Sequence, residues 1–195
     1  MANTKKLNRE QIVKLAMGGI LTAVVVVLQL LGSFIKFGPF SVSLVLVPII
    51  VGAALCGPYI STWLGFVFGV TVLLSGDAAL FLAINIPGTV ITVLLKGALC
   101  GLTAGLVFAV CKKLNTYLSV VLSAIVCPIT NTGIFLVGCR LFFYDTISDW
   151  GADAGFTNTF TYMIVALVGL NFVFELASNI ILCPAIVRIV NAFKK

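Results

Sequence analysis

The sequence predicts an all-α membrane protein with six transmembrane helices, formed by a single domain of residues 1–195. The composition is 61% hydrophobic and only 9% charged, with a mean hydropathy of +1.22. A soluble fold of this length has too little interior to bury so much apolar surface, whereas a bilayer accepts about 20 apolar residues per helix. Long apolar segments also follow one another along the chain, with Lys and Arg gathered at their ends. We therefore expect a multi-pass protein of a cell membrane.

The first span is expected at about 15–35. The next apolar segment, 41–74, would reach about 51 Å as one helix and so exceeds the bilayer core of about 30 Å. Cys56-Gly57-Pro58 divides this segment with a turn signal, which predicts two short helices. The fourth to sixth spans are expected at about 89–110, 117–143 and 162–190, with Pro128 as a kink in the fifth.

The distribution of basic residues predicts the orientation of these spans. Lys and Arg cluster near both termini and at Lys112 and Lys113, which places both termini and the 111–115 loop in the cytoplasm. Six spans agree with this arrangement, because an even number of crossings places both termini on the same side of the membrane. The outer loops are then about 33–40, 75–88 and 144–161, and the last contains three Asp residues but no Lys or Arg. The net charge of +6 therefore reflects membrane orientation and does not indicate nucleic-acid binding.

Several classes of chemistry are not supported by the sequence. It contains no histidine, and its six cysteines show no C-x-x-C pairing, so we expect neither a metal site nor a cofactor. The cysteines are interpreted as small packing residues. No phosphate-binding loop, metalloprotease motif or nucleophile elbow is present, and no pair of carboxylates lies within one span. We expect a non-catalytic chain.

Two apolar spans carry polar side chains on one helical face each. In the sixth span these are Asn171, Glu175 and Asn179, and in the fourth they include Thr92 and Lys96. Ionisable groups are costly in a bilayer and usually face the protein interior. Lys96 and Glu175 either neutralise each other, with the Asn residues bonding helices together, or line an outward-opening pocket for a polar solute.

Other polar residues extend this candidate site. Asn131 lies in the fifth span, and Arg140 lies near the outer end of that span. Arg140 either contributes to the pocket or reaches the outer lipid headgroups. Asn85 belongs to an outer loop that either folds over the pocket or forms an ordinary interfacial turn.

A strip of small residues on the first span, Ala16, Gly19 and Ala23, predicts a close helix contact. The partner helix belongs either to another chain or to this one. The branched residues Val24 to Val27 that follow favour a contact with lipid or with another chain.

These features together resemble the substrate-capture subunit, or S component, of energy-coupling-factor (ECF) vitamin transporters. The similarity extends over the whole chain and includes the basic N-terminus that leads into the small-residue strip. The segments Phe37-Gly-Pro-Phe-Ser-Val-Ser-Leu-Val-Leu-Val-Pro48 and Val51-Gly-Ala-Ala-Leu-Cys-Gly-Pro58 resemble the riboflavin, pantothenate and folate branch. The strip differs from the usual A-x-x-x-A pattern of the family, because it has Gly19 four residues before Ala23.

The resemblance implies a subunit of the bacterial cytoplasmic membrane that binds a water-soluble vitamin from outside. Its expected partners are a membrane coupling subunit and two cytoplasmic ATPase subunits. The expected solute-binding residues lie in the last three spans and the outer loops: Asn85, Thr92, Lys96, Asn131, Arg140, Asn171, Glu175 and Asn179. Pantothenate is the first candidate because cations suit an anionic vitamin, and riboflavin is the second because Trp150 and Phe156 can stack on it. The alternatives are a non-transport scaffold subunit and a self-sufficient small carrier.

Overall fold

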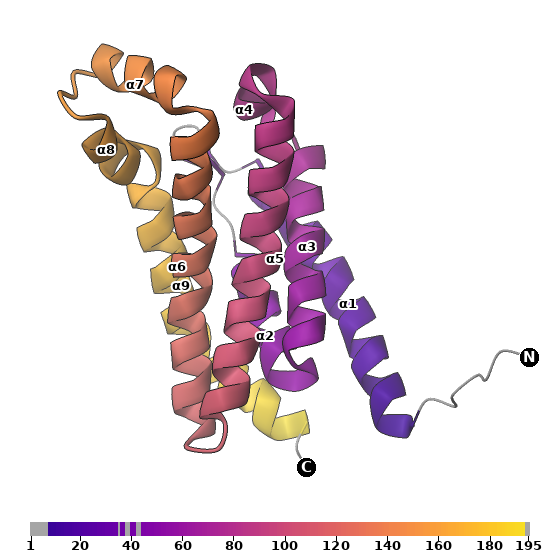
Figure 1. Ribbon diagram of the computed structural model, residues 1–195. Coiled ribbons are helices and arrows are strands. Elements are labelled where there is room, and N and C mark those ends of the chain that lie inside the picture. Colours follow the sequence, from indigo (N-terminus) through magenta and orange to yellow (C-terminus); the bar gives the residue numbers. More distant parts are fainter. Residues whose placement is uncertain (1–7, 35, 38–39, 42–43, 194–195) are drawn as a thin grey trace, which may run out of the picture.

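Figure 1 shows a computed structural model of the chain, which describes residues 8–34, 36–37, 40–41 and 44–193. The described part is built almost entirely from helices. In chain order the elements are α1 (Arg9–Gly32), β1 (Lys36–Phe37), β2 (Phe40–Ser41), α2 (Leu46–Cys56), α3 (Pro58–Leu74), α4 (Ala79–Ile84), α5 (Ile86–Cys111), α6 (Thr116–Phe142), α7 (Tyr144–Asp153), α8 (Thr159–Tyr162), a π-helical turn (Met163–Leu167) and α9 (Gly169–Phe193). The all-α prediction is confirmed apart from the antiparallel pair of β1 and β2, each two residues long.

Among the described helices, α1, α5, α6 and α9 are long and apolar enough to cross a membrane. Between 22% and 39% of their most apolar windows is buried inside the protein, so most of this surface faces outward. Large apolar side chains such as Leu31, Val137 and Ile181 are exposed, as expected for contact with lipid. Helices α2 and α3 are the two short helices predicted for 41–74, and they have 11 and 17 residues.

The turn between α2 and α3 lies where the sequence predicted it. Gly57 has a φ of +93°, which favours glycine because other residues carry a Cβ that is strained in this region. Pro58 then occupies the first turn of α3, where its missing N–H costs no hydrogen bond.

Helix α2 lies at the centre of the bundle and contacts α1, α3, α5, α6 and α9. Most of its residues are buried, including Leu46, Ile49 and Ile50, which have no exposed surface. A helix of 11 residues is only about 16 Å long, roughly half the thickness of the bilayer core. It therefore fills only part of the depth of the bundle interior.

Helices α3 and α5 approach so closely that their backbones touch. An added Cβ at Gly65 would lie 2.0 Å from the carbonyl oxygen of Gly97, and one at Gly101 would lie 2.0 Å from that of Ser61. Glycine is needed at these positions because any side chain would force the helices apart. The spacing of Gly65 and Gly69 on α3 matches that of Gly97 and Gly101 on α5, which is the small-x-x-x-small pattern of membrane helices.

The sixth predicted span, 162–190, is not one continuous α-helix. The chain forms a π-helical turn over Met163–Leu167, and α9 begins only at Gly169. The backbone is tight here, since a Cβ on Gly169 would lie 3.0 Å from the carbonyl oxygen of Ile164. This interruption could not be predicted from hydropathy, which does not distinguish α from π geometry.

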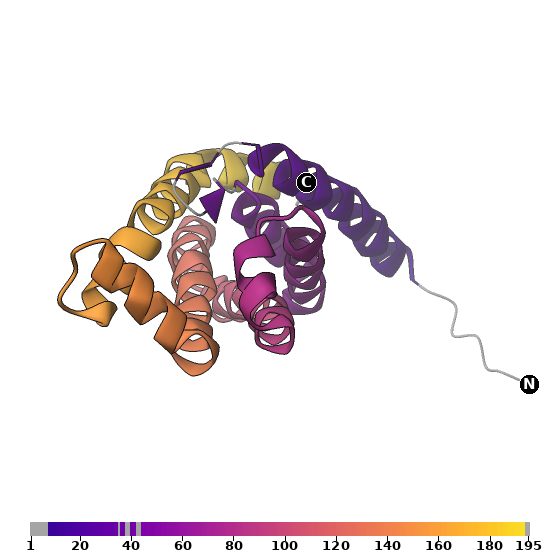
Figure 2. The same cartoon turned by 90° about the horizontal axis from the view of Figure 1, so that it is seen from above.

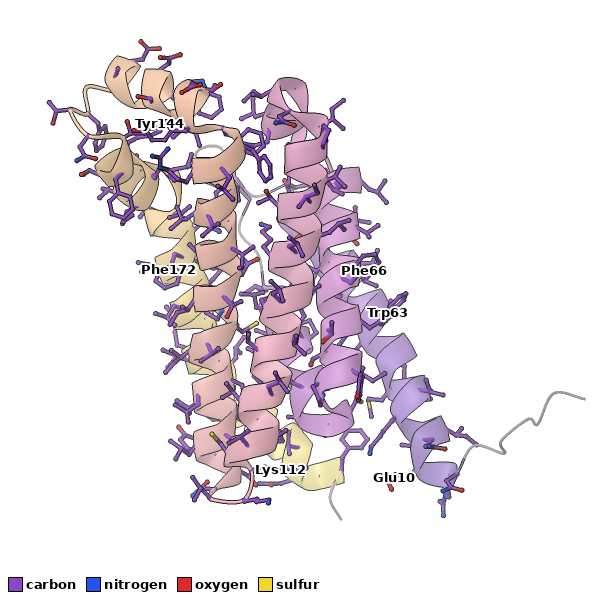
Figure 3. All side chains as sticks on the ribbon, in the orientation of Figure 1. Glu10, Trp63, Phe66, Lys112, Tyr144 and Phe172 are labelled. Atoms are coloured by element: carbon purple, nitrogen blue, oxygen red, sulfur yellow. The ribbon has the colours of Figure 1, made fainter. Side chains whose placement is uncertain are left out.

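The two ends of the bundle differ in charge. At one end, which we call the basic end, α1 begins, α5 joins α6 and α9 ends. Glu10 and Lys112 both lie at this end (Figures 1 and 3). The opposite, acidic end carries α4, α7 and α8, with Asp145, Asp149 and Asp153 on α7 (Figure 1). The further cations Lys5, Lys6, Lys194 and Lys195 lie outside the described residues.

Candidate functional site

A cavity of about 60 Å³ lies in the half of the bundle nearer the acidic end. Figure 2 looks down on this end and shows α1 and α9 on one side of the bundle and α5 and α6 on the other. The cavity is lined from all of these helices, from α3 and α4 and from the turn before α4, but not from the described residues of α2. Because α2 is short, the bundle interior remains open at this depth. The lining residues are Gln29, Phe68, Val72, Asp77, Ala78, Phe81, Thr89, Thr92, Val93, Lys96, Phe135, Phe143, Asn171 and Glu175.

Lys96 projects from α5 into this cavity between two aromatic rings. Its Nζ lies 5.7 Å from the ring centre of Phe68 on α3 and 5.3 Å from that of Phe135 on α6. Aromatic faces attract cations, more strongly where water is excluded. Lys96 makes no salt bridge or hydrogen bond with any described residue. Its ammonium group is therefore held by aromatic rings and keeps its hydrogen-bond donors available to the cavity.

Glu175 on α9 lies in the same cavity with 2% of its surface exposed. Its carboxylate accepts hydrogen bonds from Asn171 Nδ2 at 3.2 Å and from Asn131 Nδ2 at 3.5 Å. These amides come from α9 and α6, so the carboxylate connects the two helices. The hydrogen bonds offset part of the cost of burying the charge. A direct salt bridge between Glu175 and Lys96, one of the two arrangements that the sequence left open, is not present in this structure.

Within the described part of the chain, three buried polar side-chain atoms have no hydrogen-bond partner: Thr92 Oγ1, Asn131 Oδ1 and Asn179 Nδ2. Their residues are 4%, 4% and 1% exposed, respectively. Thr92 lines the cavity, whereas Asn131 and Asn179 lie beside it, the latter one helical turn beyond Glu175. Buried polar groups without partners are rare in native structures because each costs about 1–3 kcal/mol. The region around Glu175 therefore has unused capacity for hydrogen bonds.

The cavity lining also contains three polar residues that the candidate set lacks: Gln29, Asp77 and Thr89. Gln29 on α1 donates a hydrogen bond from Nε2 to Oδ2 of Asp77, which lies in the turn before α4. Ser75 Oγ donates to the same carboxylate oxygen at 3.3 Å. Sequence reasoning overlooked Gln29 because it is one polar residue in an apolar span whose partner lies 48 positions away. The available signal was a single amide near the C-terminal end of an otherwise apolar helix.

An aromatic cluster closes the cavity towards the acidic end. The Phe81 ring on α4 packs edge to face against Phe135, Phe143 and Trp150, with ring centres 5.5, 5.1 and 6.1 Å away. Such arrangements are favoured by the charge distribution of aromatic rings. Phe81, Phe135 and Phe143 line the cavity, and Trp150 packs behind them.

The cavity lining lacks four of the predicted solute-binding residues: Asn131 and Asn179, which lie beside it, and Asn85 and Arg140, which have other partners. Asn85 caps the beginning of α5, where its Oδ1 accepts a hydrogen bond from the backbone N–H of Gly88 at 2.9 Å. Arg140 is exposed, and its guanidinium lies 3.9 Å from the ring centre of Tyr144, which Figure 3 shows at the acidic end. Both residues therefore have local structural partners.

The small-residue strip lies on the outside of α1. Ala16, Gly19 and Ala23 are exposed, and a Cβ added at Gly19 would meet no atom within 4 Å. Helix α1 packs into the bundle through a different face, formed by Gly18, Leu21, Val25 and Gln29. Contact with another helix of the described chain therefore does not explain Gly19.

Comparison with known protein families is consistent with this arrangement. The sequence model described as "ECF transporter, substrate-specific component" matches residues 13–187. The chain has no match among curated proteins or solved structures. The matched range includes every described lining residue of the cavity and the exposed strip on α1. Since the match spans most of the sequence, the chain belongs to the substrate-specific component family of ECF transporters.

Proposed function

We propose that the protein captures a water-soluble vitamin from outside the cell in the cavity around Lys96 and Glu175. Members of the family are multi-pass transport components that work with a membrane coupling subunit and ATPases and are not catalytic themselves. The observation that carries the proposal is the environment of Lys96. A cation that lies between two phenylalanines and makes no salt bridge with a described carboxylate is suited to an anionic group of a solute.

Pantothenate is the first candidate solute because its carboxylate complements Lys96. The unpaired atoms of Thr92, Asn131 and Asn179 supply donors and acceptors for the remaining polar groups of such a molecule. Riboflavin is the second candidate. The phenylalanines at positions 68, 81, 135 and 143 support it, because a flat aromatic ring system stacks well on them.

Binding of either vitamin requires the cavity to enlarge. Small-molecule pockets usually measure about 300–1,000 Å³, several times the volume observed here. The aromatic cluster around Phe81 closes the cavity on the acidic side. Its rings come from α4, α6 and α7 and from Phe143, which links α6 to α7. We infer that outward displacement of α4 and Phe81 admits the solute.

The remaining elements of the proposal concern orientation and partners. Six crossings with both termini in the cytoplasm place the acidic end, and hence the cavity, outside. The exposed strip of Ala16, Gly19 and Ala23 is the proposed contact with the coupling subunit, which acts with two cytoplasmic ATPase subunits. The family match favours this role over a scaffold or a self-sufficient carrier.

Purification in detergent, followed by mass spectrometry of any retained small molecule, tests the proposed function. Isothermal titration calorimetry with pantothenate and riboflavin then gives the affinities. Saturable binding of one vitamin, lost or strongly weakened in Lys96→Met, is the expected result. A wild-type protein that is folded and binds neither vitamin would show the solute assignment to be wrong.

A further inference from the structure

Helix α1 contributes a polar side chain to the cavity through Gln29. This residue is 2% exposed and continues the buried face of α1 formed by Gly18, Leu21 and Val25. A glutamine placed among apolar residues in a membrane helix is costly unless its amide is paired. One half of the amide is paired, because Nε2 donates to Asp77. The other half, Oε1, accepts no hydrogen bond from any described residue.

The turn before α4 is shaped to present Asp77 to the cavity. Gly76 has a φ of +83°, a conformation that residues with a Cβ rarely adopt. Ser75 holds the Asp77 carboxylate from the end of α3, while Gln29 holds it from α1. If the hydrogen bond between Gln29 and Asp77 served only to connect α1 with this turn, neither residue would need to contact the cavity. Both residues nevertheless line it.

We propose that Gln29 and Asp77 form a second recognition subsite, which accepts hydrogen bonds from hydroxyl groups of the solute. The inference rests on the proposed function, because it concerns the same cavity. Lys96 interacts with the anionic group of the solute, and the Gln29–Asp77 subsite interacts with its hydroxyl end. Thr92 Oγ1, which lines the cavity without a partner, is a further group that a hydroxyl can satisfy. The solute class is therefore a hydroxylated molecule, and α1 joins the helices that determine specificity.

The physical basis for selectivity is the cost of unpaired polar groups. A solute without hydroxyl groups displaces water from Gln29 Oε1 and leaves that oxygen without a donor. Sites built to bond a hydroxyl discriminate strongly against analogues that lack it, for this reason. We expect the wild-type protein to prefer the hydroxylated solute by about tenfold or more.

The test compares affinities for matched solutes in wild type, Gln29→Leu and Asp77→Asn. The probes are pantothenate and its analogue with both hydroxyl groups replaced by hydrogen, together with riboflavin and lumiflavin, which lacks the hydroxylated side chain. We expect Gln29→Leu to reduce the preference for the hydroxylated probe to about threefold or less. Asp77→Asn retains the size of the side chain and is expected to reduce the preference in the same direction.

Ser75→Ala is the matched control, because it removes the other hydrogen bond to Asp77 from a residue that does not line the cavity. Its preference should remain within about twofold of wild type. A purely structural pair would weaken both members of each probe set equally and leave the preference unchanged in all variants. An unchanged preference in folded Gln29→Leu or Asp77→Asn would overturn the subsite while leaving vitamin capture intact. Failure of the wild type to bind any probe would instead overturn the proposed function and the subsite with it.

Discussion

Lys96 and Glu175 line the same cavity but make no salt bridge with each other. The Lys96 ammonium lies between Phe68 and Phe135, whereas the Glu175 carboxylate accepts hydrogen bonds from Asn131 and Asn171. Each charge thus has separate local partners. The two side chains therefore do not form a direct buried salt bridge, in which removal of either partner leaves an uncompensated charge.

Lys96→Met is expected to weaken binding of an anionic vitamin about 10- to 150-fold, or by about 1.5–3 kcal/mol, the range for a hydrogen bond to a charged group. Calorimetry with pantothenate measures this loss. The double variant that combines Lys96→Met with Glu175→Gln should fold but still bind the vitamin poorly. Because Lys96 and Glu175 are not direct partners, the second change should not restore the affinity lost with the first. Wild-type affinity in a well-folded double variant would exclude Lys96 from the solute site.

Two variants of Glu175 are expected to distinguish the contribution of its charge to the stability of the fold from the contribution of its hydrogen bonds. Glu175→Ala removes the acceptor for the Asn131 and Asn171 amides and should lower stability by about 1–3 kcal/mol. Glu175→Gln keeps a carbonyl oxygen and should cost less. Thermal unfolding in detergent measures both variants. Equal loss in the two would indicate that the charge itself, and not its role as an acceptor, stabilises the fold.

The exposed strip on α1 is expected to act in uptake and not in binding. Gly19→Leu and Ala23→Leu place bulky side chains on the surface, so vitamin affinity should stay near wild type while transport by the complete complex is blocked. Val110→Leu, at an exposed position on α5, is the control. Normal uptake by both strip variants would place the docking surface elsewhere.

Gly65→Ala is expected to destabilise the fold by at least about 1–3 kcal/mol, because its new methyl group would lie 2.0 Å from the Gly97 carbonyl oxygen. Gly133→Ala on α6 is the matched control, since a Cβ there meets no atom within 4 Å. It should be neutral or slightly stabilising through its better helix propensity. Unfolding temperatures of the two variants provide the comparison, and similar values would argue against the close backbone contact.

The predicted orientation is testable by cysteine labelling in intact cells. Asp149→Cys on α7 should react with a reagent that does not cross the membrane, whereas Cys111 should react only with a permeant one. A background without Cys56 and Cys111 isolates the signal of the α7 position. The opposite pattern would reverse the orientation and place the cavity on the cytoplasmic side.

Features governed by local chemistry could be predicted from the sequence. The turn at Gly57 and Pro58 follows from backbone preferences, and the membrane helices follow from hydropathy. Lys96, Thr92, Asn171 and Glu175 were predicted to share a polar interior because each lies on a polar face of an apolar helix, and all four line the cavity. The capping role of Asn85 was missed, although Asn followed by Ile-Pro-Gly is a typical helix start.

Features that depend on contacts between distant segments could not be predicted in this way. The Gln29–Asp77 hydrogen bond joins a membrane helix to a turn, and neither residue belongs to a polar face that periodicity would reveal. The π-helical turn at Met163–Leu167 arises within an apolar segment that carries no signal for it. The glycines of α3 and α5 do show a four-residue spacing, but only the structure shows that the two sets meet.

The backbone contact between α3 and α5 has a mechanical consequence for the transport cycle. Two helices whose backbones touch have little room to shift relative to each other, so we expect Phe68 and Lys96 to move together. The proposed opening by α4 and Phe81 would then leave this unit in place, with α1 contributing Gln29 and α9 contributing Asn171 and Glu175 to the opposite wall. In that case the cation would be a fixed point of the proposed site, from which Phe81 on α4 moves away when the cavity opens.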